Sequence, residues 1–166
     1  MDIFVIGATG FVGGAAARHL AARGHSVSGL ARSDAAARAL SEQGIVAVRG
    51  DLEEGRAAVV ASVADAVIVA AQLDPTVEQV LVDELLDALA GTGRTLLLTS
   101  GTGAFLQRTG GAWSEDVYAE DDPFEVEPLA RQRFAVEQAV RRAGRHPRPR
   151  RSGTQPEPVR GEPRLG

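Results

Sequence analysis

Three glycines with a fixed spacing stand near the start of the chain. Gly7, Gly10 and Gly13 follow an apolar run at residues 2–6 and lead directly into a helical pattern. In such a turn the first glycine permits a tight exit from a strand, the second lets the backbone approach phosphates, and the third lets the helix pack closely on the sheet. The start of that helix also offers free N–H groups and a partial positive charge. The residues predicted to bind a pyrophosphate are Gly7, Thr9, Gly10, Phe11, Val12 and Gly13.

A basic residue stands at the end of the second apolar run, in the sequence Ala31-Arg32-Ser33. A dinucleotide-binding fold that selects NAD places a carboxylate there for the ribose 2′-hydroxyl, whereas an arginine accommodates the 2′-phosphate of NADP. Arginine suits a phosphate because its planar guanidinium can form two parallel hydrogen bonds. Arg32 and Ser33 therefore predict NADP as the cofactor, with NAD less favoured. The alternative is a solvent-facing Arg32 beside a Ser33 that only caps the next helix.

Apolar runs alternate with helical patterns along most of the chain, which is typical of βαβ units and a parallel sheet. In the first helix Ala15, Ala16 and Leu20 are expected to face that sheet, and in the last helix Leu129 and Val136 are expected to make apolar contacts. The expected strands are residues 2–6, 26–31, 45–49, 66–70 and 94–99, and the expected helices are residues 11–23, 33–43, 53–63, 75–90 and 128–142.

These elements predict an α/β fold, a doubly wound parallel sheet of the Rossmann-like NAD(P)-binding type, over residues 1–143. Residues 101–127 lack a clear period and gather glycine, acidic residues and most of the aromatic residues, as loops that carry function often do. Residues 144–166 are rich in proline, arginine and glycine. We expect this tail to be disordered, because it cannot bury enough apolar surface to offset the entropy of ordering.

Composition limits the other kinds of site. The 166 residues include no cysteine and only three scattered histidines, so we expect no metal site. The net charge of -4 argues against nucleic acid as a partner. No targeting segment or long apolar run is visible, so we expect a cytoplasmic protein that does not enter a membrane.

Four motifs together resemble the extended and atypical short-chain dehydrogenase/reductases, the NAD(P)-dependent epimerase/dehydratase family. They are the glycine turn at residues 7–13, Gly50-Asp51-Leu52, Val69-Ala70-Ala71 and Thr99-Ser100, and the resemblance covers residues 1–143. It implies that Asp51 accepts a hydrogen bond from the adenine amino group, with Leu52 beside the ring, and that Ala70 and Ala71 line the cofactor ribose. The alternatives are a helix cap for Asp51 and ordinary sheet packing for the two alanines.

The same resemblance assigns catalysis to a serine and to a Tyr-x-x-x-Lys pair, but this chain has Leu129 and Arg133 at the positions of the pair. Ser100 matches the serine that orients a substrate carbonyl; Thr102 is an alternative. A leucine cannot transfer a proton, and an arginine stays protonated. Arg133 is expected either to hold the nicotinamide ribose or to form a surface pair with Glu137, one helical turn away.

The implied function is that of an NADP-preferring oxidoreductase or epimerase-like protein, with hydride transfer to or from a small carbonyl compound or a sugar nucleotide. The catalytic candidates are Ser100 and Arg133, since the only tyrosine, Tyr118, lies in the loop. The alternative is a non-catalytic or truncated module that binds NADP without turnover. The family resemblance further implies a homodimer formed through the last two helices.

Overall fold

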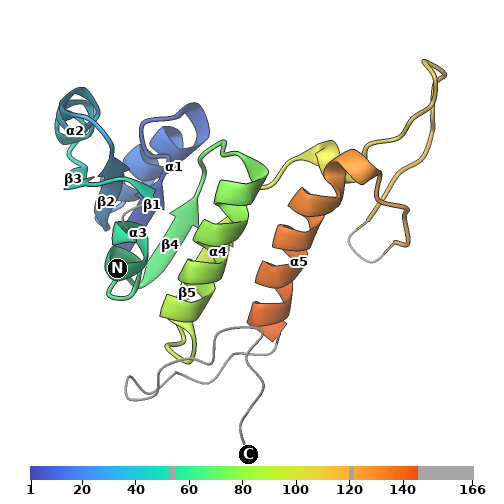
Figure 1. Cartoon of the computed structure of the whole chain (residues 1–166). Coiled ribbons are helices and arrows are strands. Elements are labelled where there is room, and N and C mark those ends of the chain that lie inside the picture. Colours follow the sequence, from blue (N-terminus) through green and yellow to red (C-terminus); the bar gives the residue numbers. More distant parts are fainter. Residues whose placement is uncertain (53–54, 120–121, 146–166) are drawn as a thin grey trace, which may run out of the picture.

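A single parallel sheet organises the computed structural model, which describes residues 1–52, 55–119 and 122–145. The strand order is β3-β2-β1-β4-β5, and every neighbouring pair runs parallel (Figure 1). The predicted α/β, Rossmann-like class is therefore confirmed. The strands are β1 (Asp2–Ile6), β2 (Ser26–Ala31), β3 (Val46–Arg49), β4 (Ala66–Val69) and β5 (Thr95–Leu98).

Helices cover both faces of the sheet. Helices α1 and α2 pack with one hydrophobic cluster and α3 and α4 with another, while α5 packs on α4 and on the partly buried leucines of β5. The chain moves from β1 outward to β3, then crosses to β4 on the other side of β1, so the strand order reverses between β1 and β4. In open α/β sheets a ligand crevice forms at that reversal, beyond the carboxyl ends of the strands. The helices are α1 (Phe11–Ala22), α2 (Asp34–Ser41), α3 (Arg56–Ala61), α4 (Pro75–Leu89) and α5 (Arg131–Arg145).

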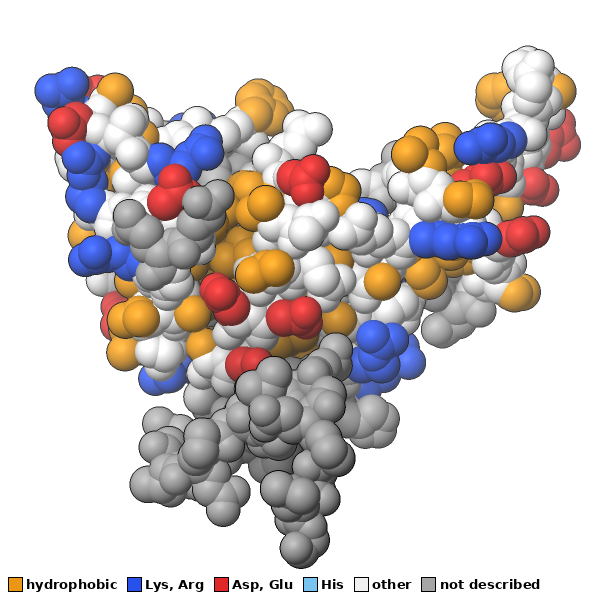
Figure 2. Space-filling model, in the orientation of Figure 1, with side chains coloured by type: hydrophobic (Ala, Val, Ile, Leu, Met, Phe, Trp, Pro, Cys, Tyr) orange, Lys and Arg blue, Asp and Glu red, His pale blue; other side chains and the backbone are white. Residues whose placement is uncertain are grey.

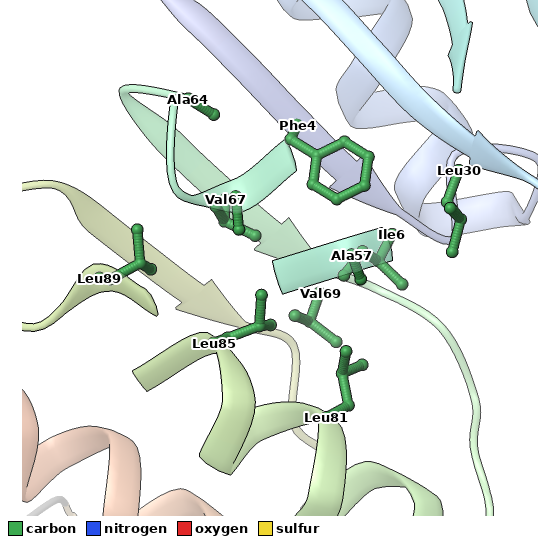
Figure 3. Packing of buried hydrophobic residues seen from close by; sticks show 11 residues of the cluster. Phe4, Ile6, Leu30, Ala57, Ala64, Val67, Val69, Leu81, Leu85 and Leu89 are labelled. Carbon is green, nitrogen blue, oxygen red and sulfur yellow. The ribbon is translucent and has the colours of Figure 1, made fainter. Parts of the chain in front are cut away.

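The larger core cluster lies between the central strands and α4 (Figure 3). Leu81, Leu85 and Leu89 recur every fourth residue and point from α4 toward β4 and β1. Phe4 is fully buried on this face of β1, whereas its neighbour Val5 belongs to the cluster on the opposite face. Strands that are buried on both faces explain the nearly continuous apolar runs in the sequence.

The face that α1 turns to the sheet differs from the expected one. Gly13, Gly14 and Ala17 are buried there, while Ala15 is exposed. A Cβ on Gly14 would stand 2.9 Å from the carbonyl oxygen of Ala8, closer than side chains normally come. The glycines therefore let the helix backbone approach the strand, and the expectation that Ala15 faces the sheet is wrong.

Two helix starts carry a side-chain cap, and the cap at Ser33 is the one that the alternative interpretation of this residue required. The Ser33 hydroxyl accepts a hydrogen bond from the N–H of Ala36 at 3.2 Å and caps α2. The Asp74 carboxylate accepts one from the N–H of Thr76 at 2.9 Å, and Pro75 opens α4. Both caps satisfy donors that the first turn of a helix leaves without a partner. They determine where α2 begins after β2 and where α4 begins after β4.

The segment between β5 and α5 stands away from the rest of the molecule (Figure 1). Acidic, basic and hydrophobic side chains are mixed along it (Figure 2). Near its two ends the rings of Phe105, Tyr118, Phe124 and Phe134 form a cluster with neighbouring centroids 4.7–5.7 Å apart. This cluster joins the segment to α5. Two short 3-10 helices, Thr102–Phe105 and Pro128–Ala130, mark its start and end.

Helix α5 differs in two details from the expected last helix. Val136 is fully buried as expected, but Leu129, just before the helix, is 79% exposed, so the apolar contact expected of it is wrong. The helix continues to Arg145 and includes Gly144. Residues 146–166, most of the expected tail, lie outside the described residues. Within the described residues, no helix has the length and apolar character needed to cross a membrane.

Candidate dinucleotide-binding site

A cavity of about 590 Å³ opens beyond the carboxyl ends of β1, β2 and β4, where the strand order reverses. It brings together residues from four separate connections between strands and helices. The predicted cofactor-binding residues that line it are Gly7, Thr9, Gly10, Arg32, Ser33, Asp51, Leu52, Ala70 and Ala71.

The glycine turn has little room for side chains. Gly7 has a φ of +93°, and a Cβ on it would lie 2.6 Å from the carbonyl oxygen of Ala70. A Cβ on Gly13 would lie 2.3 Å from the carbonyl oxygen of Gly7. The N–H of Gly10 donates to that same oxygen at 2.9 Å and closes the turn. The turn, the end of β4 and the start of α1 are therefore in direct backbone contact.

Gly10 has a different reason to be glycine. A Cβ on it would meet only the carbonyl oxygen of Gly7 at 3.2 Å, a contact that a small shift relieves. Gly10 lines the cavity, so a glycine here serves the approach of a ligand more than the packing of the fold.

The start of α1 faces the cavity without a side-chain cap or an acidic residue in its first turn. The N–H groups of Phe11, Val12 and Gly13 are the orphan donors of a helix start. Phe11 is 95% exposed and Val12 53% exposed, and Thr9 is exposed beside them. Together with the positive end of the helix dipole, these donors fit a pyrophosphate.

Arg32 and Ser33 are both exposed at the rim of this cavity. No ion pair joins Arg32 to another of the described residues, whereas Arg49 pairs with the neighbouring carboxylate of Asp34. Asp34, the acid nearest to Arg32 in the sequence, therefore forms its ion pair with Arg49 and not with Arg32. Ser33 caps α2, as the alternative interpretation required, and lines the cavity as well.

Asp51 is exposed after β3, and Leu52 beside it is half-buried. The Asp51 carboxylate accepts a hydrogen bond from the N–H of Leu52 at 2.6 Å. Helix α3 begins after Gly55, so Asp51 does not cap that helix. The position at the cavity agrees with the role that the family resemblance implies, which stays a prediction.

A second cavity, of about 380 Å³, shares Ala70, Ala71 and Gln72 with the first. It is also lined by Val12, Thr99, Ser100, Gly101, Gly103 and Arg133. The two cavities thus form one groove that runs from Arg32, past the glycine turn, to the end of β5. Ser100 and Arg133, which are far apart in the sequence, meet at its far end. The side chain of Thr102, the alternative to Ser100, lies outside the described part.

Arg133 is held by two elements besides its own helix. One guanidinium nitrogen, Nη1, donates to Oε1 of Glu78 on α4 at 2.5 Å, and Nη2 donates to the carbonyl oxygen of Thr99 at 2.6 Å. The surface pair with Glu137, the alternative expected for Arg133, is therefore wrong. The carboxylate of Glu137 instead accepts a hydrogen bond from the hydroxyl of Ser100.

Glu78 is the most buried charged residue of the described chain, with 1% of its surface exposed. Its Oε2 atom has no hydrogen-bond partner among the described residues. Burial raises the pKa of Glu78, and the opposing attraction of Arg133 does not cancel this effect. The carboxylate of Glu137 raises the pKa of Glu78 further.

Sequence reasoning missed Glu78 altogether and gave Glu137 a different partner. A usable signal was present, because Glu78 stands four residues before Val82, on the apolar stripe that α4 buries. A carboxyl in such a stripe needs a partner, and Arg133 supplies it. Tyr118 lies in the ring cluster and accepts a hydrogen bond from Gln107. No group of three or more metal-ligating side chains occurs in the described ranges.

Comparison with protein families gives one match. A family model described as NAD(P)H-binding matches residues 7–147, which include every residue that lines the two cavities except Ile6. A comparison with curated proteins finds no significant match.

Many solved structures share the fold. A candidate epimerase from Burkholderia cenocepacia J2315 is 28% identical with a TM-score of 0.60, over 84% of this chain and 49% of that one. A candidate NADH-flavin reductase from Streptococcus pneumoniae TIGR4 is 27% identical with a TM-score of 0.57, over 86% and 66%. A short-chain dehydrogenase/reductase superfamily protein from Agrobacterium tumefaciens, solved with bound NAD, is 23% identical with a TM-score of 0.66, over 90% and 47%. The chain thus spans about half to two thirds of the length of these proteins.

Proposed function

Because the chain belongs to the NAD(P)H-binding family, we propose that it binds NADP in preference to NAD. The observation that carries this proposal is Arg32, an exposed guanidinium that lines the groove at the end of β2 without an ion pair to another described residue. The 2′-phosphate of NADP would be its partner, with the pyrophosphate at the start of α1 and the adenine near Asp51. A carboxylate suited to the 2′-hydroxyl of NAD is missing from positions 31–33.

The proposed activity is that of an oxidoreductase or epimerase-like protein acting on a small carbonyl compound or a sugar nucleotide. When bound, NADP supplies hydride transfer at the C4 atom of its nicotinamide. The protein contributes binding, orientation and polarisation. Ser100 would donate its hydroxyl proton to the substrate oxygen after turning away from Glu137, to which it donates in the ligand-free protein, and Arg133 would hold the nicotinamide ribose through its remaining N–H groups.

A second candidate function is a module that binds NADP without turnover. Leu129 favours it, because this residue occupies the position of the family's tyrosine and its exposed side chain can neither donate nor accept a proton. Tyr118 does not replace that tyrosine, since it is absent from the described residues that line the second cavity.

Separate titrations with NADPH and NADH test cofactor binding. The fluorescence of the nicotinamide reports how much nucleotide is bound. We expect NADPH to bind about tenfold more tightly or better, the size of one charge-assisted hydrogen bond or more. Equal affinity would contradict the NADP preference. Absence of binding by either nucleotide would overturn both candidate functions.

Oxidation of bound NADPH by a panel of aldehydes and ketones then separates the two candidates. Chromatography of nucleotide sugars incubated with the protein completes this second test. Conversion of any substrate supports the enzyme. Tight binding with no conversion in the whole panel supports the non-catalytic module.

A further inference from the structure

We propose that Glu78 is a positioning residue for the nicotinamide end of the groove and acts through Arg133. This role rests on the proposed function, since it assumes that a dinucleotide fills both cavities. Glu78 does not line either cavity, while Arg133 lines the second. The carboxylate therefore affects a ligand only through the arginine that it holds.

The first support is the environment of the carboxyl group. Glu78 is 1% exposed on a helix face whose other buried members are leucines and valines, among them Leu81 and Val82. An apolar residue would pack there without the desolvation that a carboxyl group incurs. The carboxyl binds the guanidinium of Arg133 at 2.5 Å, which offsets part of the desolvation, and its second oxygen has no partner in the described chain.

The second support is the way in which the arginine is fixed. Nη1 contacts Glu78 of α4, Nη2 contacts the Thr99 carbonyl at the end of β5, and Arg133 itself belongs to α5. These contacts use two of the five N–H donors of the guanidinium. Three donors remain on a planar group whose orientation is set from two directions. Without Glu78, a long flexible side chain would keep only the contact with Thr99.

The third support is the position of this arrangement along the groove. Arg133 and Thr99 line the second cavity only, whereas Arg32 and Asp51 line the first only. A change at Glu78 should therefore affect the nicotinamide half of a bound dinucleotide and leave the adenosine half unaffected. A general loss of folding would affect both halves alike.

The test compares Glu78→Gln with the unmodified protein by isothermal titration calorimetry. The ligands are NADPH, which spans both cavities, and adenosine 2′,5′-bisphosphate, which has no nicotinamide. We expect Glu78→Gln to weaken NADPH about threefold to tenfold, because the amide oxygen can still accept from Arg133 but without the charge that strengthens the bond, with the bisphosphate within about twofold. Glu84→Gln on the same helix is the matched control, because Glu84 is only half-buried and lines neither cavity.

If Glu78→Gln fails to fold, Glu78→Leu takes its place in the test, because a leucine matches the apolar residues buried on the same face of α4. Arg133→Gln should give the same selective loss of NADPH, and the double variant should lose no more than either single one. Equal loss of both ligands, additive losses in the double variant, or an unchanged NADPH affinity would each overturn the role of Glu78. Failure of the unmodified protein to bind either ligand would instead overturn the proposed function, and this role with it.

Discussion

The two ends of the groove, which we propose hold the adenosine and the nicotinamide halves of a dinucleotide, are built in different ways. At the adenosine end the backbone determines the shape, because Gly7 and Gly13 leave no room for a Cβ. At the nicotinamide end long side chains determine it, because Arg133 reaches Glu78 and the end of β5 from a separate helix. The first arrangement is local in sequence, and the second joins residues 55 positions apart. The first arrangement therefore depends on a short stretch of backbone, whereas the second depends on the tertiary packing of α5 beside α4.

Gly13→Ala should give the largest effect, since it changes the end that the backbone builds. The new Cβ would lie 2.3 Å from the carbonyl oxygen of Gly7, so α1 must move away from the turn. Overpacking of this kind costs about 1–3 kcal/mol of unfolding free energy. We also expect the loss of measurable NADPH binding, because the donors of α1 move with the helix. Denaturant unfolding and NADPH titration measure the two effects.

Gly10→Ala is the matched control for that variant. Its Cβ would meet a single atom at 3.2 Å, so this variant should lose less stability than Gly13→Ala while NADPH binding still weakens. If Gly10→Ala destabilised the protein as much as Gly13→Ala, the two glycines would not have the separate roles assigned to them.

Arg32→Ala should give the next largest effect and should be specific to one nucleotide. Removing the guanidinium from the 2′-phosphate should weaken NADPH about tenfold to hundredfold, the usual range for a hydrogen bond to a charged group. NADH has no 2′-phosphate, so its affinity should change less than about twofold by the same argument. Titration of both nucleotides measures the ratio. Arg38→Ala, an exposed change on α2, serves as the control, and equal losses for NADPH and NADH would show that Arg32 does not contact the 2′-phosphate.

The fold and the adenosine end could be predicted from the sequence because their causes are local. The predicted bounds of β1 and β2 are those of the structure, since apolar runs end at Gly7 and at Arg32. The caps at Ser33 and Asp74 depend on side chains that bond the backbone within three residues. Short-range rules of this kind need no knowledge of the tertiary fold.

The nicotinamide end could not be predicted in the same way. The nearest acid to Arg133 on its own helix is Glu137, and helical spacing favours that pair. Tertiary packing instead places α4 beside α5, so Arg133 reaches Glu78 while Glu137 reaches Ser100. The expectation that Ala15 faces the sheet was wrong for a related reason, whereas Leu20 does pack against the core cluster. The spacing of small residues does not show how closely two backbones will approach.

The smallest expected effect is a change with pH in the stability of the ligand-free protein, caused by Glu78 at the nicotinamide end of the groove. Burial raises the pKa of Glu78 above its ordinary value of 4.5, so the folded protein holds this proton more tightly than the unfolded chain does. Glu78 then contributes stability that is present below that ordinary value and is lost as pH rises through the raised pKa. The glutamine in the Glu78→Gln variant does not titrate, so this variant does not lose that stability as pH rises.

Thermal unfolding of both proteins from about pH 4 to about pH 8 measures how the slope of melting temperature against pH differs between them. The melting temperature of Glu78→Gln, relative to the unmodified protein, should rise with pH through the raised pKa of Glu78. The other groups that face Glu78 are Arg133, which stays charged, and the Glu137 carboxylate, so Glu137→Gln is the control. This control should retain most of the slope, because burial, the main cause of the raised pKa, is unchanged in it. A melting difference that stays constant across the range would mean that Glu78 has the same pKa in the folded protein as in the unfolded chain, because the attraction of Arg133 then fully offsets the effect of burial.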